Sequence, residues 1–302
     1  MVETRIETMR SRFVRVVGDL LESDDRAVVV LAVINRGLFM EAGLIDRFPD
    51  RIIDVGIREQ LQIGVAGGLA LEGFRPIVAG YAPFLVERPY EQIKVSLTHQ
   101  AAGAVLVSVG GSWDSSGSGR THQSPADVAL VSALPGWTVH VPGHPDELGA
   151  LLRHAYETDG STYIRTSIES NRRAHVARPG EIAKLREGSG DALTVLVIGP
   201  GADEALAGVS DLDATVLYTA TPTPLDREAL DAKVVGDELV LIEPYLAGTS
   251  VARVADALSH RPMRIRAHGV RDAEVRRYGA PNEHRRFHGL DTEGIRAFIT
   301  SG

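Results

Sequence analysis

Apolar and polar positions follow two periods that alternate along the chain. Stretches with apolar residues three or four positions apart, the spacing of an amphipathic helix, alternate with short continuous runs of the kind found in buried strands. The helical stretches cover residues 10–22, 37–48 and 81–100, and the strand-like runs cover residues 27–34, 52–55, 76–79 and 104–110. Buried strands separated by helices predict an α/β fold with a doubly wound parallel sheet.

A second unit of the same kind follows a polar stretch. Residues 171–191 carry many charged residues and no apolar period, so we interpret them as a linker. Beyond it, strand-like runs lie at residues 193–198, 214–217 and 238–242. The expected organisation is therefore two doubly wound α/β domains, at residues 1–170 and 192–302, joined by the linker.

Composition narrows the class of protein. With 302 residues the chain is long enough for two domains, and its net charge of −8 disfavours nucleic-acid and anionic-membrane partners. The absence of cysteine excludes disulfides and thiolate chemistry. The first residues do not resemble a secretory signal, and the longest apolar run, residues 27–34, is too short to cross a membrane. We therefore expect a cytoplasmic protein with no membrane partner.

Two segments carry candidate chemistry. After the strand at residues 52–55, Gly56 makes a turn and Glu59 falls in the first turn of a helix. About sixty residues later, Gly119-Arg-Thr-His-Gln123 places His122 after a loop rich in glycine and serine. The motifs G-x-x-x-x-G-K-[ST], G-x-G-x-x-G and G-x-S-x-G do not occur, so common phosphate-binding loops and the serine nucleophile elbow are not supported.

Metal ligation is not predicted. His284 and His288 are four residues apart, as two ligands on a helix can be, but two arginines intervene and no third ligand is evident. We interpret both histidines as surface residues and expect no metal site in this chain.

Several fragments together resemble the transketolase family, and especially deoxyxylulose-phosphate synthase. They are Gly56-Ile-Arg-Glu-Gln60, Tyr81-Ala-Pro-Phe84, Gly119-Arg-Thr-His-Gln123, Leu134-Pro-Gly-Trp137, Asp159-Gly-Ser-Thr-Tyr-Ile-Arg165, Pro222-Thr-Pro-Leu-Asp226 and Gly289-Leu-Asp-Thr-Glu-Gly-Ile295. Each fragment is weak alone, but they occur in the family's order over essentially the whole chain. The resemblance implies a pyrimidine-binding domain followed by the family's C-terminal domain, and thiamine diphosphate as the cofactor.

The resemblance also implies roles at the cofactor. In the family, the glutamate that matches Glu59 hydrogen-bonds the aminopyrimidine and favours its imino form, so that the cofactor acts as its own base. Tyr81 and Phe84 match rings that pack around the aminopyrimidine, although a core role for Phe84 is equally compatible with the sequence. Arg88 matches a nearby family arginine only if one residue is inserted between Phe84 and Arg88.

On the substrate side, His122 matches a catalytic histidine that contacts the donor, and Gln123 beside it is a second polar candidate. The surroundings depart from the family. Ser118 stands where transketolase has an acid, and Arg120 replaces a proline. At the position of the family's basic residue that binds a substrate phosphate, this chain has glycine, either Gly110 or Gly111. Arg165 matches a phosphate-binding arginine, or pairs with a local acid. The substrates are therefore expected to be small molecules of which the donor or the acceptor is specialised.

The chain lacks half of what a complete enzyme of the family carries. The motif Gly-Asp-Gly, which together with Asn-Asn holds Mg²⁺ or Ca²⁺ on the diphosphate, is absent from this sequence. The resemblance therefore implies a diphosphate-binding partner subunit that carries both motifs, in a 2+2 heterotetramer.

The favoured function is transfer of a two-carbon ketol unit from a ketose, with a phosphorylated ketose favoured, to an acceptor. The β subunit of a 2-oxoacid dehydrogenase, which passes an acyl group to a lipoyl or carrier arm, is the main alternative. A non-enzymatic binding module is the third.

Overall fold

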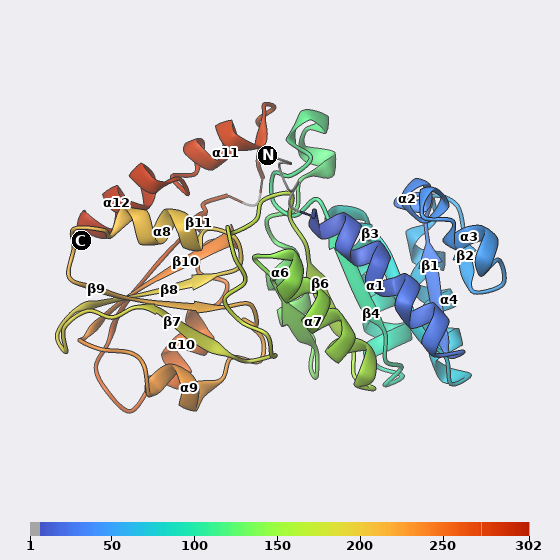
Figure 1. The fold of residues 1–302 in the computed structure, drawn as a ribbon, viewed down its shortest axis with the longest axis horizontal. Helices are drawn as coiled ribbons and strands as arrows, with labels where there is room; N and C mark the ends of the chain where they lie inside the picture. Colours follow the sequence, from blue (N-terminus) through green and yellow to red (C-terminus); the bar gives the residue numbers. More distant parts are fainter. Residues whose placement is uncertain (1–6, 273, 302) are drawn as a thin grey trace, which may run out of the picture.

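The computed structural model describes residues 7–272 and 274–301, which form two α/β domains side by side (Figure 1). The first domain contains helices α1 (Met9–Ser23), α2 (Arg36–Glu41), α3 (Leu44–Arg47), α4 (Glu59–Leu71), α5 (Tyr90–Gln92), α6 (Asp127–Ser132) and α7 (Pro145–Glu157). Its strands are β1 (Ala27–Leu31), β2 (Ile52–Asp54), β3 (Arg75–Tyr81), β4 (Val105–Val109), β5 (Thr138–His140) and β6 (Thr162–Arg165). The expected α/β class with parallel, doubly wound strands is confirmed.

The first sheet has the order β2-β1-β3-β4-β6-β5, and all its paired strands are parallel. Successive residues of β1 face opposite sides, because strand side chains alternate. Val29 packs in the apolar cluster that includes residues of α1 and α7, whereas Val30 packs in the cluster that includes residues of α4 and α6. Helices thus cover both faces, which explains why the strands read as continuous apolar runs.

The region between β3 and β4 differs from the single long helix that its apolar spacing predicts. It consists of π-helical turns η1 (Pro83–Glu87) and η2 (Ile93–Thr98) with the short α5 between them. Pro83 and Pro89 stand at the starts of η1 and α5, and a proline has no N–H to continue a preceding helix. Arg88 N donates to Pro83 O, a bond that spans five residues as a π-turn requires.

The second domain contains strands β7 (Ile182–Arg186), β8 (Leu193–Ile198), β9 (Ala214–Thr219), β10 (Glu238–Leu246) and β11 (Arg264–Val270), in the order β11-β10-β8-β9-β7. Its helices are α8 (Ala202–Gly208), α9 (Arg227–Asp231), α10 (Val251–Ala257), α11 (Pro281–Phe287) and α12 (Thr292–Thr300). In Figure 1, α8 and α12 lie on one side of the sheet and α9 and α10 on the other. The stretch proposed as a linker, residues 171–191, contains β7, which pairs antiparallel with β9 at the sheet edge.

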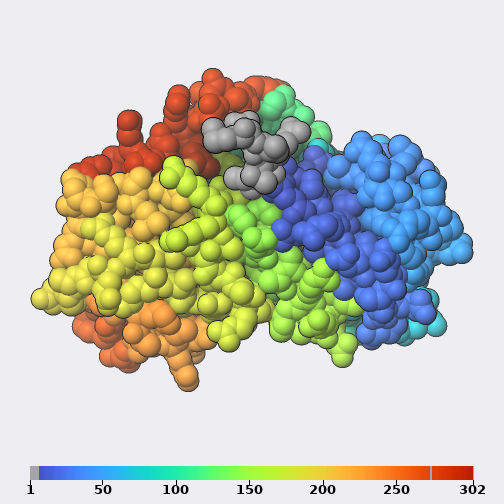
Figure 2. All heavy atoms as spheres, in the orientation of Figure 1, coloured from blue at the N-terminus to red at the C-terminus, as the bar shows by residue number. Residues whose placement is uncertain are grey.

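The domains are joined by backbone and buried side chains. Val139 N on edge strand β5 donates to Thr223 O at 2.7 Å, and Val141 N donates to Ala220 O at the same distance. Figure 2 shows the stretch after β6, in yellow-green, packed against the green residues of α7. None of the described helices is long and apolar enough to cross a membrane.

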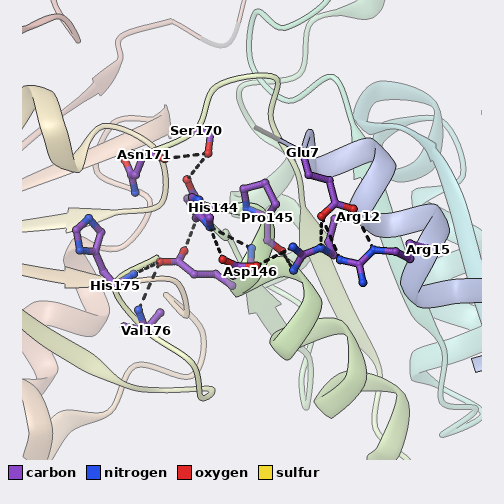
Figure 3. Close-up of polar contacts among 12 residues, drawn as sticks. Glu7, Arg12, Arg15, His144, Pro145, Asp146, Ser170, Asn171, His175 and Val176 are labelled. Atoms are coloured by element: carbon purple, nitrogen blue, oxygen red, sulfur yellow. Dashed lines mark hydrogen bonds and ion pairs between the residues drawn. The ribbon is translucent and has the colours of Figure 1, made fainter. Parts of the chain in front are cut away.

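A polar joint lies where the stretch Ser170–Val176 meets the start of α7 (Figure 3). Glu147, which is fully buried, accepts hydrogen bonds from Tyr218 Oη at 2.6 Å and from the backbone N–H groups of Gly143 and His175 at 2.7 Å each. Burial raises the pKa of the Glu147 carboxyl, while the bonds from Tyr218 and the backbone lower it. One carboxylate therefore connects α7, the interdomain stretch and β9.

Candidate active site

Glu59 is presented at the carboxyl edge of the first sheet by the turn between β2 and α4. Gly56 adopts a positive φ of 73°, and its N–H donates to Asp54 Oδ1 at 3.0 Å. Gln62, one turn into α4, donates from Nε2 to Val30 O and Ala79 O at 2.8 and 3.0 Å. These bonds hold the start of α4 against β1 and β3, and they leave Glu59 only 3% exposed.

Arg88 neutralises this buried carboxylate. Its Nη1 atom lies 2.8 Å from each carboxylate oxygen of Glu59, and its guanidinium carbon lies 4.3 Å from the centre of the Phe84 ring. The inserted residue that the sequence comparison requires is accommodated by the π-turn η1, which fits one more residue into a turn than an α-helix does. Arg88 therefore reaches Glu59 despite the insertion.

Three rings form a cluster beside this pair. Tyr81 stands at the end of β3, Phe84 lies in η1, and His122 lies in the short 3₁₀ turn η4 (Arg120–His122). The His122 ring centre is 5.0 Å from that of Phe84 and 5.7 Å from that of Tyr81, with edge-to-face geometry in both pairs. The structure thus brings together Glu59, Tyr81, Phe84, Arg88 and His122 from three separate segments, as the sequence analysis proposed for a site.

The residues around His122 differ in how accessible they are. Ser118 is exposed, whereas Gln123 is fully buried and donates from Nε2 to Arg277 O at 2.9 Å. Arg120 is not a free cation, since its Nε lies 3.0 Å from Glu274 and its Nη1 lies 3.8 Å from Glu87. Ser118 faces solvent, while Gln123 and Arg120 are engaged by neighbouring protein groups.

Arg165 pairs with a local acid, the alternative that the sequence left open. Its Nε donates to Asp127 Oδ2 at 2.9 Å and its Nη2 donates to Ser112 Oγ at 2.6 Å, and its side chain is 2% exposed. Tyr163 Oη also donates to Asp127, at 2.7 Å. Such a buried pair fixes the packing beneath the loop before His122, and both charges are satisfied there.

Glycines occupy positions 110 and 111 for steric reasons. A Cβ at Gly110, where φ is +76°, would lie 2.7 Å from Tyr81 Cδ1, and a Cβ at Gly111 would lie 2.5 Å from Arg165 Cζ. A basic side chain at either position would displace the Tyr81 ring or the Arg165 pair.

The interpretation of His284 and His288 as surface residues is wrong. Both are buried, at 0% and 4% exposure, and His288 stacks on Trp113 with ring centres 5.3 Å apart. Burial lowers the pKa of His288 to about 4, so it is neutral near pH 7. The intervening Arg285 pairs with Glu169 and Glu204. Its charge is therefore compensated by protein groups, and the helix that carries both histidines can pack against the protein. Among residues 7–272 and 274–301, no three His, Cys, Asp or Glu side chains are grouped to hold a metal.

Sequence reasoning missed the acids that pair with the site's cations, namely Glu87, Asp127 and Glu274. Asp127 carried a usable signal, because it stands in the first turn of a helix that follows the His122 segment. Glu274 lies about 150 residues from Arg120, and nothing in the local sequence connects the two.

The sheet order and the helices on both faces define an α/β protein with a doubly wound parallel sheet in its first domain. The profile of the family described as "Transketolase, pyrimidine binding domain" matches residues 7–172, more than half of the chain, and the chain belongs to that family.

Relatives extend the similarity over the whole chain. The sequence is 45% identical over 297 residues to an uncharacterized 33.6 kDa protein in the fasciation locus of Rhodococcoides fascians, with 97% of this chain and 94% of that protein covered. It is 30% identical over 294 residues to 1-deoxy-D-xylulose-5-phosphate synthase of Aromatoleum aromaticum, where it covers 93% of this chain but 46% of the relative. The chain thus spans about half the length of the synthases that it matches.

Two solved structures share the fold. One is described as a split gene transketolase, inactive beta4 tetramer, with a TM-score of 0.84, 24% identity and 98% of both chains covered. The other is transketolase from Campylobacter jejuni, with a TM-score of 0.79, 15% identity, and 98% of this chain but 46% of that chain covered.

Proposed function

We propose that this chain is the pyrimidine-binding subunit of a two-chain, thiamine-diphosphate-dependent transferase of the transketolase type. It would move a two-carbon ketol unit from a ketose to an acceptor. The observation that carries the proposal is the buried Glu59 carboxylate at the edge of the cluster formed by Tyr81, Phe84 and His122.

The residues fit a flat, weakly basic ring. The planar guanidinium of Arg88 already lies over Phe84 while it hydrogen-bonds Glu59, so a planar group with donors at its edge suits this position. Glu59, Tyr81 and Phe84 would contact the aminopyrimidine, with Glu59 sharing a proton with a ring nitrogen, and Arg88 would move toward solvent and border the ring. When bound, thiamine diphosphate supplies the nucleophilic carbon that the chemistry requires.

On the donor side, we assign His122 to proton transfer and to contact with the substrate's oxygens, and Ser118 to contact with a hydroxyl. Arg120 would border the entrance with its charge compensated by Glu274 and Glu87. Gln123 and Arg165 support the loop from beneath, because both are buried and bonded to protein groups. This arrangement favours a hydroxylated donor, with any phosphate held mainly by another chain.

The partner would supply the diphosphate site and its Mg²⁺ or Ca²⁺. Large apolar side chains lie exposed around the start of α4, namely Val33 at 46%, Ile57 at 72% and Leu61 at 46% exposure. Exposed apolar residues clustered beside a site are typical of an interaction surface. A solved structure of the same fold, covered to 98%, is described as a split gene transketolase, which also supports a partner subunit. We propose a 2+2 assembly.

Cofactor binding tests the two-chain proposal. The chain alone, the Gly-Asp-Gly and Asn-Asn partner alone, and the mixture would be titrated with thiamine diphosphate and Mg²⁺ in a calorimeter. Tight binding is expected only for the mixture. Micromolar binding by this chain alone would contradict the proposal.

Substrate consumption tests the reaction. The mixture would be incubated separately with ketoses, ketose phosphates and 2-oxoacids, with and without an aldose acceptor. Ketol transfer predicts that a ketose is consumed without release of carbon dioxide. Carbon dioxide release from a 2-oxoacid with no ketose consumed would instead assign the chain to the dehydrogenase class.

A further inference from the structure

The loop that carries His122, residues 110–124, has little secondary structure of its own. It contains two three-residue 3₁₀ turns, η3 (Ser116–Ser118) and η4, and its ends are joined by the bridge between Ser112 and Ser124. Four of its residues are glycines, which cost more backbone entropy to order than other residues. A fixed position for His122 therefore needs support from outside the loop.

That support comes from a segment of the second domain, residues 274–279, which precedes α11. Ser116 Oγ donates to Gly279 O at 2.6 Å, and Gln123 Nε2 donates to Arg277 O at 2.9 Å. Arg120 Nε donates to Glu274 at 3.0 Å. These three bonds reach the loop before, inside and after η4. In Figure 1 the green loop lies beside the red chain that leads into α11.

Packing reinforces these bonds. Tyr278 lies against Gly119, where a Cβ would be 2.6 Å from the Tyr278 ring, and Trp113 stacks on His288 of the second domain. At the base of the loop, Ser112 Oγ donates to Pro244 O at 2.6 Å, and Leu246 N donates to Pro125 O at 2.8 Å. The second domain therefore contacts the loop along its whole length.

We infer that residues 274–279 act as a clasp that holds His122 against Tyr81 and Phe84, and that Gln123 is a positioning residue rather than a substrate ligand. The orientation of the Gln123 amide follows from its partner, because a carbonyl oxygen accepts only from the amide nitrogen. The Gln123 side chain is fully buried, and Gln123 directly follows His122 in the sequence. The second domain thus contributes to the site without touching the reacting groups.

The position of His122 can be measured on the chain alone, independently of its proposed function. In protein labelled at histidine, phenylalanine and tyrosine, the His122 ring signal would be assigned by its loss in His122→Asn. Wild type is expected to show one His122 signal with nuclear Overhauser contacts to Phe84 and Tyr81. Gln123→Met, Ser116→Ala and Glu274→Gln should weaken those contacts and broaden the signal.

Ser259→Ala is the matched control, because Ser259 is exposed and its Oγ donates to Asp256 O at 2.9 Å, away from the loop. Circular dichroism would verify that each variant folds, and Ser116→Ala and Glu274→Gln remain informative if Gln123→Met does not. Unchanged His122 contacts in all folded clasp variants would overturn the inference.

The consequence for turnover rests on the proposed function. In the reconstituted complex, Gln123→Met should lower kcat by about 10- to 100-fold, since misplacement of a group by about 1 Å has effects of that size. Cofactor affinity should stay within about twofold of wild type. Equal kcat in wild type and variant would overturn the role of the clasp in turnover, whereas an inactive wild-type complex would overturn the proposed function and leave the ring measurement to decide the inference.

Discussion

Glu59 is a buried acid whose partner is partly exposed. The Glu59 side chain is 4% exposed, whereas that of Arg88 is 40% exposed. A ligand with a hydrogen-bond donor can therefore replace Arg88 from the solvent side without leaving the carboxylate unpaired, which would be costly in a buried position. This asymmetry distinguishes Glu59 from Asp127, whose partner Arg165 is as buried as the acid itself.

Glu59→Gln tests this residue directly. Glutamine keeps the size of the side chain but cannot hold the negative charge that would favour the proton on a ring nitrogen. Turnover of the reconstituted complex, and hydrogen–deuterium exchange at the cofactor's reactive carbon, should fall by about 10²-fold or more. Exchange at wild-type speed in an assembled Glu59→Gln complex would remove Glu59 from the proposed mechanism. Glu91→Gln, at an exposed pair with Lys94, is the control.

At this scale the sequence indicates which side chains take part but not their partners. The positions of Glu59, Tyr81, Phe84, Arg88 and His122 in one cluster followed from motifs in family order. The pairing of Arg120 with Glu274 did not, because it depends on how two domains pack. The burial of His288 likewise involves a contact between distant segments, its stacking on Trp113, which local polarity does not report.

At the scale of elements, α4 is apolar on more than one face. Gly67 lies on its inner face, where a Cβ would be 2.6 Å from Ser96 O in η2. Gly64 and Gly68 lie on its outer face with no atom within 4 Å of a Cβ position, beside the exposed Leu61 and Leu71. The inner glycine is required by packing in this chain, whereas the outer ones are not.

Alanine substitutions should separate these two faces. Gly67→Ala is expected to lower the free energy of unfolding by about 1–3 kcal/mol, because backbone must move to admit the methyl group. Gly64→Ala should raise it by about 0.5–1 kcal/mol, since glycine is unfavourable inside a helix. Urea denaturation of the isolated chain measures both. Similar effects of the two substitutions would contradict the packing described for α4.

Buried Glu243 on β10 predicts a pH dependence. It accepts from Gly248 N and Ser250 N at 2.7 and 2.9 Å, and burial raises the pKa of its carboxyl to about 7. The native state therefore binds more protons than the unfolded chain between about pH 4.5 and 7, so this group lowers the stability as pH rises through that range. The loss should reach about 3 kcal/mol near pH 7.

The measurement compares wild type with Glu243→Gln by urea denaturation at pH 5, 6 and 7. Glutamine cannot ionise, so the difference in unfolding free energy between the two proteins should shift in favour of the variant as pH rises. A difference that stays constant over these three values would mean that Glu243 is ionised throughout.

The sequence predicts elements well where they are fully buried apolar strands, and less well where their form depends on contacts with distant segments. The apolar runs at β1, β4 and β8 mark buried parallel strands, and these were foreseen. Strand β7 was not, because it is a half-buried edge strand with charged residues whose partner, β9, lies beyond β8. The π-turns of residues 83–98 were not foreseen either, since their apolar spacing resembles that of an α-helix.

At the scale of the whole molecule, a small buried joint contributes to the relative placement of the two domains, together with the backbone bonds of Val139 and Val141. Asn171 Oδ1 accepts from Gly201 N and Ala202 N at 3.1 Å each, at the start of α8, while Asn171 N donates to Gly143 O at 2.7 Å. Glu147 Oε2 accepts a hydrogen bond from Gly143 N in the same turn. Because the clasp on His122 belongs to the second domain, we expect this joint to influence the geometry of the site as well.

Gly143→Ala should open the joint. A Cβ there would overlap Asn171 Nδ2 and lie 2.5 Å from Tyr218 Oη, so either the buried network or the backbone between the domains has to shift. We expect the free energy of unfolding to fall by more than about 2 kcal/mol, as buried hydrogen bonds to Glu147 are lost or distorted. Hydrogen exchange should rise in residues 171–176 and also in residues 110–124, because the clasp would move with the second domain. Gly160→Ala, with no atom within 4 Å of its Cβ position, is the control and should change neither quantity. Faster exchange in residues 171–176 with an unchanged rate in residues 110–124 would mean that the site keeps its geometry independently of the joint.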